Sequence, residues 1–383
     1  MKMYSFKTAK KIIFGWGAVK SVGEEAKQLG IGRTVIITDK GVLKVGIVDK
    51  VKDSLEKEGI EYKIWDGVES EPSIEIAEEA ASFVRSEEFD GVIGVGGGST
   101  MDTAKASALS INNLGKITEI FKKQPAPFLL IPTTSGTGSE VSNVAIFSTP
   151  EVKHALYSSL MYPDLAIVDP ELTVTLPPFI TAQTGIDALC HAIEAYTSLK
   201  ANIITDTLAL KAIELIVNNL RSAYTNGTVD ARTNMSYAAL IAGIAFGNAG
   251  TVIGHACGYA YVYPATDIHL PHGLAIAITM PYVLRYNAIA DLKKHANISK
   301  LLGGSTKGLS LSDAATRCAS DFKQLLIDLD IKTSLKDVGV TKDMIPKLAK
   351  NVFKSKNHVA RNPRTISEED MIDLFIKAYN AKL

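Results

Sequence analysis

The sequence changes character once, close to residue 170, and this change constrains the fold more than any other feature. Up to that point, short β-branched segments alternate with amphipathic, charge-rich segments, the pattern of parallel strands joined by crossover helices. Beyond it, apolar residues recur at helical spacing. A length of 383 residues corresponds to between two and three domains of about 150 residues. We therefore predict a doubly wound α/β domain at residues 1–178 and an all-α domain at residues 179–383.

The expected elements follow from runs of apolar residues between polar turns. Predicted strands occupy residues 34–39, 62–66, 91–95 and 128–132. Predicted helices of the first domain occupy residues 41–57 and 73–86 and a segment that begins at Ser99. Predicted helices of the second domain occupy residues 181–198, 206–220 and 234–246, and helical spacing returns beyond Asp313. Open α/β sheets bind ligands beyond the carboxyl ends of their strands, so these ends are where we look first for a site.

Charge balance limits the possible partners. Lys plus Arg and Asp plus Glu each number 41, so the formal net charge is zero. This balance argues against nucleic acid or an anionic membrane surface as the main partner. An apolar fraction of 46% against 21% charged residues suits a protein with a large buried core.

The N-terminal segment and the cysteines both favour a cytoplasmic protein. The segment MKMYSFKTAKKIIFGWG has basic residues but only a short apolar run, unlike a signal peptide or a membrane anchor. Elsewhere the chain lacks the roughly 18 uninterrupted apolar residues of a spanning helix. Cys190, Cys257 and Cys318 are widely spaced and odd in number, which fits reduced thiols. We expect a cytoplasmic protein.

A glycine-rich turn stands where the third predicted strand passes into a helix, in the sequence GVGGGSTMDTAK of residues 94–105. Glycines leave no side chain between backbone amides and a ligand, and a helix N-terminus attracts phosphate. The spacing departs from G-x-G-x-x-G because Ser99 stands where the third glycine would be. The turn is therefore either a phosphate site or a tight turn with Ser99 as the N-cap.

A second polar turn, PTTSGTGSE at residues 132–140, follows the next predicted strand. Its hydroxyls and glycines would face the same crevice as the first turn, unless they only bond within their own loop. Asp39 ends the first predicted strand, where an acid can accept hydrogen bonds from an adenosine ribose and repel an extra 2′-phosphate. This favours NAD over NADP, although Asp at a strand end is also an ordinary turn former.

Asp187 and His191 are four residues apart on a predicted helix with apolar neighbours, so both project from one enclosed face. A surface hydrogen-bonded pair is the alternative reading. His255 lies in a segment rich in small residues, and His272 lies between Pro271 and Gly273. Together these side chains offer three imidazole nitrogens and one carboxylate, a set suited to Fe(II) or Zn(II).

The remaining histidines and the cysteines are alternative candidates for metal ligands. His269 is a rival of His272, but the flanking proline and glycine favour His272. His154, His295 and His358 lie in charged or polar stretches and are predicted at the surface. Cys190 and Cys257 adjoin proposed ligands, and we expect a buried apolar role for both.

Taken together, these motifs resemble the iron-containing (group III) alcohol dehydrogenase family over nearly the whole chain. The matching segments are residues 96–105, 132–140, 168–172, 185–194, 271–273 and 362–364. The resemblance implies an N-terminal Rossmann-like NAD(P)-binding domain, a helical C-terminal domain and a catalytic metal. It places the metal ligands at Asp187, His191, His255 and His272. It places the cofactor contacts at Asp39, Gly96, Gly97, Gly98 and Ser99, and at Thr133, Thr134, Thr137, Ser142 and Lys153.

One position departs from the alcohol branch of that family. Many members have another His four residues after the third ligand, thought to relay a proton, and this chain has Tyr259 there. Tyr259 is then the candidate catalytic residue for the proton, together with water or a ribose hydroxyl. The segments 246–250 and 269–273 are also similar to the hydroxyacid-oxoacid transhydrogenase branch.

The expected function is a metal-dependent, NAD-linked alcohol dehydrogenase with Fe2+ or Zn2+ and a small alcohol or aldehyde substrate. A transhydrogenase acting on 4-hydroxybutyrate-type substrates is the alternative. A dehydroquinate synthase-like lyase has the same layout, but its cationic phosphate-binding cluster is not evident, and a non-catalytic binding protein would have no use for an open metal position. We expect a homodimer or a higher homo-oligomer.

Overall fold

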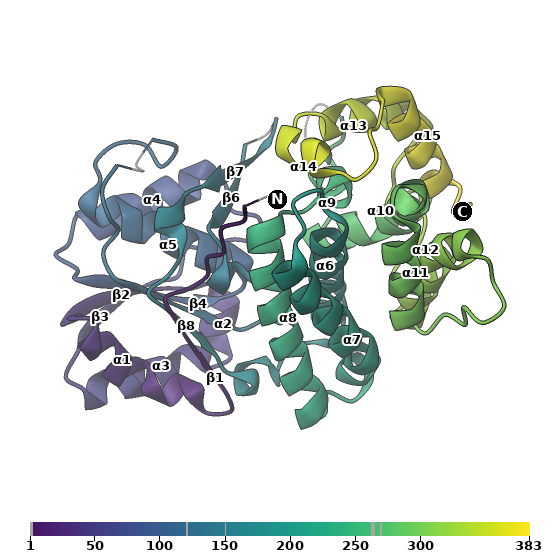
Figure 1. Cartoon of the computed structure of the whole chain (residues 1–383). Helices are drawn as coiled ribbons and strands as arrows, with labels where there is room; N and C mark the ends of the chain where they lie inside the picture. The colour runs from purple at the N-terminus through teal and green to yellow at the C-terminus, as the bar shows by residue number, and fades with distance from the viewer. Residues whose placement is uncertain (1–2, 120–121, 150, 262–264, 269) are drawn as a thin grey trace. The chain divides into compact units, whose positions relative to one another are not determined.

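The computed structural model describes residues 3–119, 122–149, 151–261, 265–268 and 270–383. Its residues form two compact units, one of Lys7–Thr149 with Lys153–Leu176 and the other made chiefly of Pro177–Leu383. The first unit, purple to blue-green in Figure 1, contains a parallel sheet, and the second, green to yellow, is helical. The predicted fold class, an α/β domain followed by an all-α domain, is confirmed.

Six strands of the first unit form one parallel sheet in the order β1-β8-β5-β4-β2-β3. These strands are β1 (Lys11–Phe14), β2 (Arg33–Ile37), β3 (Glu61–Trp65), β4 (Gly91–Gly96), β5 (Phe128–Pro132) and β8 (Leu165–Val168). The chain moves outward from β2 to β3 and then returns to the other side of β2 as β4. The loops after β2 and β4 therefore leave the sheet at a point where the winding direction reverses, which is where open α/β sheets bind ligands.

Helices cover both faces of this sheet because alternate side chains of its strands are apolar on both sides. The helices are α1 (Val22–Gln28), α2 (Lys40–Lys44), α3 (Ile47–Lys57), α4 (Ile74–Arg85) and α5 (Gly98–Asn112). Ile36 and Ile93 share one core with residues of α1 and α3, whereas Val35 and Val92 share another with residues of α4 and α5. Figure 1 shows the two layers on opposite sides of the strands.

Four strands were not predicted. β1 and β8 are only four residues long, and β8 pairs with both β1 and β5. β6 (Val144–Ser148) and β7 (Lys153–Tyr157) form a separate antiparallel pair after the second polar turn. Short segments of this kind carry little periodicity of their own and depend on their partner strands.

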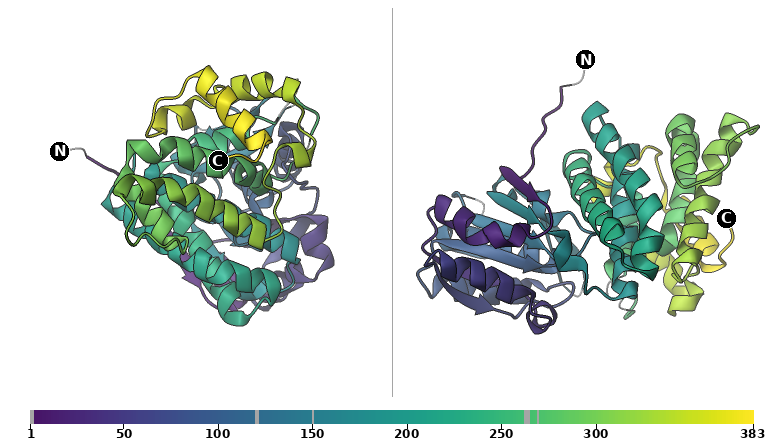
Figure 2. Two further views of the ribbon diagram at one scale, coloured as in Figure 1. Left: turned by 90° about the vertical axis from the view of Figure 1, so that its right-hand side faces the viewer. Right: turned by 90° about the horizontal axis from the view of Figure 1, so that it is seen from below.

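The second unit is built from ten α-helices among its described residues. They are α6 (Pro178–Thr197), α7 (Ile203–Thr225), α8 (Val229–Ala249), α9 (Ile253–Gly258), α10 (His272–Asn287), α11 (Leu292–Leu301), α12 (Leu311–Asp328), α13 (Ile345–Val352), α14 (Lys356–Arg361) and α15 (Glu368–Tyr379). Helices α6, α7 and α8 pack against one another, and α10 packs against α6 and α12 (Figure 2). Sixteen residues of α6 are buried, so this helix is central to the unit.

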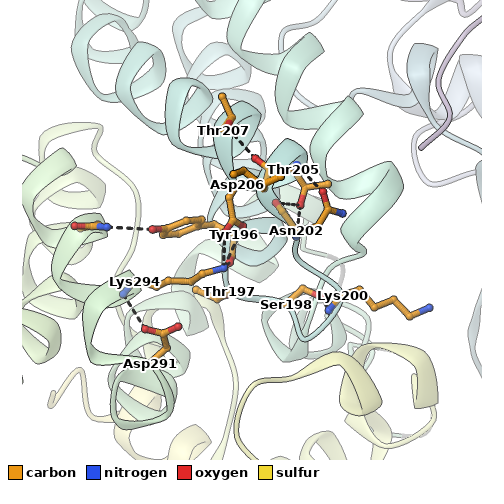
Figure 3. Close-up of polar contacts among 12 residues, drawn as sticks. Tyr196, Thr197, Ser198, Lys200, Asn202, Thr205, Asp206, Thr207, Asp291 and Lys294 are labelled. Atoms are coloured by element: carbon orange, nitrogen blue, oxygen red, sulfur yellow. Dashed lines mark hydrogen bonds and ion pairs between the residues drawn. The ribbon is translucent and has the colours of Figure 1, made fainter. Parts of the chain in front are cut away.

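Polar contacts of Lys294 join the carboxyl end of α6 to α11, and α11 to α7 (Figure 3). Lys294 of α11 donates to the backbone carbonyl of Tyr196 at 2.6 Å and pairs with Asp206 of α7 at 2.9 Å. Asn202 caps α7 by accepting from the amides of Ile204 and Thr205. No helix in the described part of the chain is both long enough and apolar enough to cross a membrane.

Candidate functional site

Helix α6 brings Asp187 and His191 to one buried face. The two side chains are one turn apart, with 3.8 Å between His191 Nδ1 and Asp187 Oδ2. Asp187 is 3% exposed and His191 is 6% exposed. Their apolar neighbours on the helix pack into the core of the unit, so the surface-pair alternative is wrong. A carboxylate placed here needs a partner, because an uncompensated buried charge is very costly.

The short helix α9 places His255 opposite Asp187. His255 Nε2 lies 3.8 Å from Asp187 Oδ1. On its other side, the ring hydrogen-bonds through Nδ1 to Glu194, which also accepts from the amides of Gly254 and His255. A Cβ on Gly254 would stand 2.6 Å from the Glu194 carboxylate. The glycine therefore leaves room for Glu194 to orient the histidine, as carboxylates commonly do for metal-binding imidazoles.

The first turn of α10 supplies His272, and three side chains then converge. Asp187, His255 and His272 each offer an atom, and these atoms all lie within 4.8 Å of one another. The His191 ring lies next to this group, 4.4 Å from the ring of His255 between centroids. All four predicted ligands are thus brought together by α6, α9 and α10. His269, the rival of His272, lies outside the described residues.

Two buried atoms of this cluster lack a hydrogen-bond partner, which bears on whether a cation fits there. Asp187 Oδ1 and His255 Nε2 make no hydrogen bond within the described structure. Leaving a buried polar atom unsatisfied costs about 1–3 kcal/mol, and here two such atoms face each other. A carboxylate oxygen and a neutral imidazole nitrogen are both electron-pair donors, so a divalent cation would satisfy them together. The donor set therefore fits a metal ion.

The electrostatics of the cluster have the same origin. Burial, assisted by the charge of Glu194, raises the pKa of Asp187 to about 8. Burial raises the pKa of Glu194 to about 8 and lowers the pKa of His255 to about 3. Without a cation, burial therefore favours the protonated, neutral form of both carboxyls. A cation beside Asp187 would instead favour its charged form.

Aromatic side chains surround the metal cluster. Phe246 stacks on His191 with centroids 4.2 Å apart, and Tyr259 stacks on His272 with centroids 5.2 Å apart. Tyr259 also meets the edge of His358 at 5.4 Å. His358 is 4% exposed and His295 is fully buried, so the prediction that both lie at the surface was wrong. His154 is partly buried on β7, and Cys190 and Cys257 are buried as expected.

In the first unit, the glycine-rich turn joins β4 to α5. Gly97 is the N-cap of α5, so the alternative in which Ser99 caps this helix is wrong. A Cβ on Gly96 would stand 2.4 Å from Thr100, and one on Gly98 would stand 2.7 Å from Thr137. Gly97 lies within 3.7 Å of Thr134 by the same measure. The glycines let the two polar turns approach closely, with the amides of α5 at the edge of the sheet.

The second turn follows β5 at the same edge. Gly96 and Pro132 are register partners in the parallel pair β4 and β5, and the Thr133 amide donates to the Gly96 carbonyl at 2.9 Å. The chain then continues through a short helical turn, Ser139–Val141, to Ser142. Ser142 is fully buried and accepts from Lys105 at 3.3 Å. Its hydroxyl is thus engaged by the protein itself.

Asp39 closes β2 at the neighbouring position and has two kinds of contact. Its Oδ1 accepts from the amides of Gly41 and Val42, so it is the N-cap of α2. Its Oδ2 accepts from the Thr100 hydroxyl at 3.4 Å, which places the carboxylate beside the first turn of α5. Asp39 is therefore a turn former that also lies next to the glycine-rich turn.

Ser99 and Lys153 meet at a residue that the sequence reasoning missed. Glu71 has a positive φ of 54° and donates its amide to the Ser99 hydroxyl at 3.2 Å. Its carboxylate pairs with Lys153 at 2.8 Å. Glu194, Asp102 and Lys105 were also missed as site residues. These three residues lie inside the segments 96–105 and 185–194 that carry the resemblance. A charged residue among small and apolar neighbours of a predicted helix is the signal that could have identified them.

Both units match known families. Residues 9–170 match "Iron-containing alcohol dehydrogenase", and residues 181–379 match "Fe-containing alcohol dehydrogenase family, C-terminal". Long-chain-alcohol dehydrogenase 1 of Geobacillus thermodenitrificans is 38% identical, with 95% of this chain and 94% of the relative covered. The mitochondrial hydroxyacid-oxoacid transhydrogenase of Bos taurus is 33% identical, with 97% and 89% covered.

Solved structures agree with these matches. The alcohol dehydrogenase from Oenococcus oeni superposes with a TM-score of 0.93 at 36% identity, over 98% of this chain and 100% of that chain. Sulfoacetaldehyde reductase from Bifidobacterium kashiwanohense, in complex with NAD+, gives a TM-score of 0.86 at 28% identity, with 100% of each chain covered. The chain therefore belongs to the iron-containing alcohol dehydrogenase family and is an oxidoreductase that acts on CH–OH groups.

Proposed function

We propose that this protein is a metal-dependent, NAD-linked alcohol dehydrogenase that interconverts an alcohol and its aldehyde or ketone. Residues 1–178 bind the dinucleotide in this proposal, and residues 179–383 bind the metal and the substrate. The observation that carries it is the convergence of Asp187, His255 and His272, with unsatisfied donor atoms buried between them. Buried polar atoms without a partner destabilise a fold, so a bound cation is the simplest reason for this set.

Four side chains would hold the metal, namely Asp187, His191, His255 and His272. The metal, when bound, acts as a Lewis acid toward a hydroxyl or carbonyl oxygen. The family points to Fe2+, and one carboxylate with three imidazoles also suits Zn2+. Glu194 holds the His255 ring so that Nε2 faces Asp187. Phe246, stacked on His191, places an apolar ring beside that side of the cluster.

The first unit would bind NAD at the edge formed by β2, β4 and β5. Amides at Gly97, Gly98 and Ser99 are available to a pyrophosphate, and Asp39 is placed to accept from a ribose hydroxyl, which favours NAD over NADP. Thr133, Thr134, Thr137, Ser142 and Lys153 are the proposed contacts around the other ribose and the nicotinamide. NAD carries the hydride at nicotinamide C4.

Tyr259 is the proposed route for the proton. Its ring lies against His272 and meets His255 edge-on at 6.5 Å, so its position suits exchange of a proton beside the metal cluster. Tyr259→Phe should then lower kcat and alter its dependence on pH while leaving metal content unchanged. An unchanged pH profile of kcat would remove Tyr259 from the mechanism.

The test of the function combines metal analysis with a substrate panel. Purified protein is prepared with and without air, its metal is identified, and short alcohols, diols and hydroxy acids are assayed by NADH absorbance. Asp187→Ala and His272→Ala should lose both metal and activity while keeping their helical content. Asp230→Asn, at an exposed position of α8, is the matched control. An Asp187→Ala, His272→Ala double variant that is active without metal would refute the proposal.

Transhydrogenation is the second candidate, favoured by Tyr259 in place of the relay histidine and by the transhydrogenase relative described above. Its substrates would be a 4-hydroxybutyrate-type hydroxy acid and a 2-oxo acid, with the cofactor retained. Turnover of 2-oxoglutarate with a hydroxy acid and no added NAD would support it, whereas strict dependence on added NAD supports the dehydrogenase. The family match gives no support to the lyase alternative.

The oligomeric state and the cellular location of the protein are also proposed. We propose a cytoplasmic homodimer or higher homo-oligomer, as expected from the sequence. Sedimentation velocity of the purified holoenzyme tests the assembly, and a species with the mass of one chain at all concentrations would contradict it.

A further inference from the structure

Helix α5 carries a lysine whose side chain is completely buried. Lys105 is 0% exposed, and its Nζ donates to the Ser139 hydroxyl and to the Val144 carbonyl, both at 2.7 Å. A third contact reaches the Ser142 hydroxyl at 3.3 Å. All three acceptors lie on the segment that runs from the second polar turn into β6. One lysine thus holds this segment at three points.

Asp102, one turn earlier on α5, holds the same segment. Its Oδ1 accepts from the Ser139 hydroxyl at 2.6 Å, and its Oδ2 accepts from the Ile146 amide at 2.9 Å. The carboxylate is also 3.6 Å from Lys105 Nζ. Ser139 is therefore shared, accepting from Lys105 and donating to Asp102. Hydrogen bonds to charged groups in a dry interior are stronger and more directional than neutral ones.

Stability alone is a poor reason for this arrangement. Removing a lysine and an aspartate from water is costly, and apolar replacements of buried ion pairs are often neutral or stabilising. The segment held by the pair contains Gly136 and Gly138, and Gly138 has a left-handed φ of 60°. Such a segment has little apolar surface with which to fix itself. What the buried pair provides is one fixed conformation of the turn.

We propose that Lys105, together with Asp102, is a positioning pair that fixes residues 133–142 for the nicotinamide and its ribose. This inference rests on the proposed function, because that turn supplies the proposed contacts to this half of the dinucleotide. The glycine-rich turn has supports of its own, in the β4–β5 register and in the close packing of Gly96 on Thr100. Loss of the pair should therefore weaken recognition of the nicotinamide half and spare the ADP half.

The experiment compares two ligands on the intact holoenzyme. Dissociation constants for NADH and for ADP are measured by fluorescence titration and calorimetry on wild type, Lys105→Met and Ser139→Ala. We expect the NADH constant to rise about tenfold or more in Lys105→Met, since a misplaced contact turn loses oriented hydrogen bonds. The ADP constant should stay within about twofold, and KM for NAD should rise more than kcat falls.

A control variant, Ser110→Ala, and the Ser139→Ala variant make the test specific. Ser110→Ala alters a buried serine of the same helix whose hydroxyl bonds only to the Ala106 carbonyl at 2.8 Å in the described contacts, so NADH binding should not change. Ser139→Ala keeps the lysine and removes the shared hydroxyl, so it carries the test if Lys105→Met does not fold. Combined with Lys105→Met, it should add less than its own single effect, because the two residues act as one unit.

The outcomes separate the two proposals. Equal weakening of NADH and ADP, or unchanged NADH binding in folded Ser139→Ala and Lys105→Met, would overturn the positioning role. A wild-type holoenzyme that binds neither NAD nor NADH would instead refute the proposed function. Selective loss of NADH affinity, with wild-type ADP affinity and wild-type metal content, supports the positioning pair.

Discussion

Glu194 is the residue on which the orientation of His255 depends. It is 1% exposed and bonds the His255 ring on the side away from Asp187. Glu194→Gln keeps the shape but weakens the acceptor, so the ring should lose its fixed tautomer and direction. We expect metal affinity to fall about 10–100-fold, as for other outer-shell partners of metal ligands. Competition with a chromophoric chelator measures the affinity directly.

Another glutamate provides the control for that change. Glu214 of α7 is half-exposed and pairs with Lys211 at 3.1 Å on the surface. Glu214→Gln should leave metal affinity unchanged. If Glu194→Gln bound metal as tightly as Glu214→Gln, the role of Glu194 would be packing alone.

Glu140 should make stability depend on pH near neutrality. Burial raises its pKa from 4.5 to about 7, against the opposing effects of a backbone hydrogen bond and Lys105. The folded protein then holds the proton more tightly than the unfolded chain. The free energy of unfolding should fall by about 3 kcal/mol as pH rises from about 4.5 to about 7, and stay level above that range.

Glu140→Gln isolates this contribution. The variant carries no titrating group at the position, so it should be more stable than wild type at pH 8 and similar to wild type near pH 4.5. Urea midpoints at several pH values measure the difference. A wild-type minus variant difference that does not change with pH would show that Glu140 is not held protonated by the fold.

The histidines show what can be inferred at this scale. Asp187 and His191 were predictable because helical spacing and apolar neighbours are both local properties of the sequence. His358 was not, because several of its neighbours in the chain are polar, and it packs in the fold against Tyr259, a residue distant in sequence. Glu71 was not, because its pairing with Lys153 depends on a loop conformation with positive φ.

At the scale of elements, Lys294 of α11 fastens the carboxyl end of α6. Besides its bonds to Tyr196 and Asp206, the ammonium lies 4.5 Å from the centre of the Tyr196 ring. Lys294→Met should destabilise the helical unit by about 1–3 kcal/mol, since it removes a charged hydrogen bond and a cation–π contact. The urea midpoint, followed by far-UV circular dichroism, measures this loss.

An exposed lysine serves for comparison. Lys211 of α7 pairs with Glu214, and both side chains are about half-exposed. Lys211→Met should change stability by less than about 1 kcal/mol because solvent screens such pairs. Equal effects of the two substitutions would mean that the contacts of Lys294 with Tyr196 and Asp206 (Figure 3) contribute no more than a surface ion pair.

The bounds of the helices show how far hydrophobic periodicity alone can predict where an element begins and ends. The helix predicted from Ser73 to Ser86 is α4, with Ser73 as its N-cap and Ser86 as its C-cap. Helices α7 and α8 begin earlier than predicted, because their first turns are stabilised by caps at Asn202 and Thr228. Capping was the additional local signal. By contrast, β1 and β8 stabilise each other, and such pairing is not a local property.

At the scale of the whole molecule, each unit has its own proposed ligand and its own core. The proposed metal ligands all lie within Pro177–Leu383, whereas the glycine-rich turn and Asp39 lie within Lys7–Thr149. A ligand stabilises only the state that binds it, by an amount that grows with its concentration relative to Kd. Metal and dinucleotide should therefore act on different parts of the unfolding profile, because proteins with two domains need not unfold in one step.

The tryptophans make this separation measurable. The chain has 2 Trp, Trp16 and Trp65, and both belong to the unit that contains the sheet. Removing the metal with a chelator should lower the thermal midpoint followed by helical circular dichroism, because the buried carboxylate and imidazoles lose the cation that compensates them. The midpoint followed by Trp fluorescence should move less on chelation. NADH should raise this midpoint, because at 100 times Kd it stabilises the unit by about 2.7 kcal/mol. Coincident shifts of both probes under chelation would show instead that the two units unfold as one cooperative body.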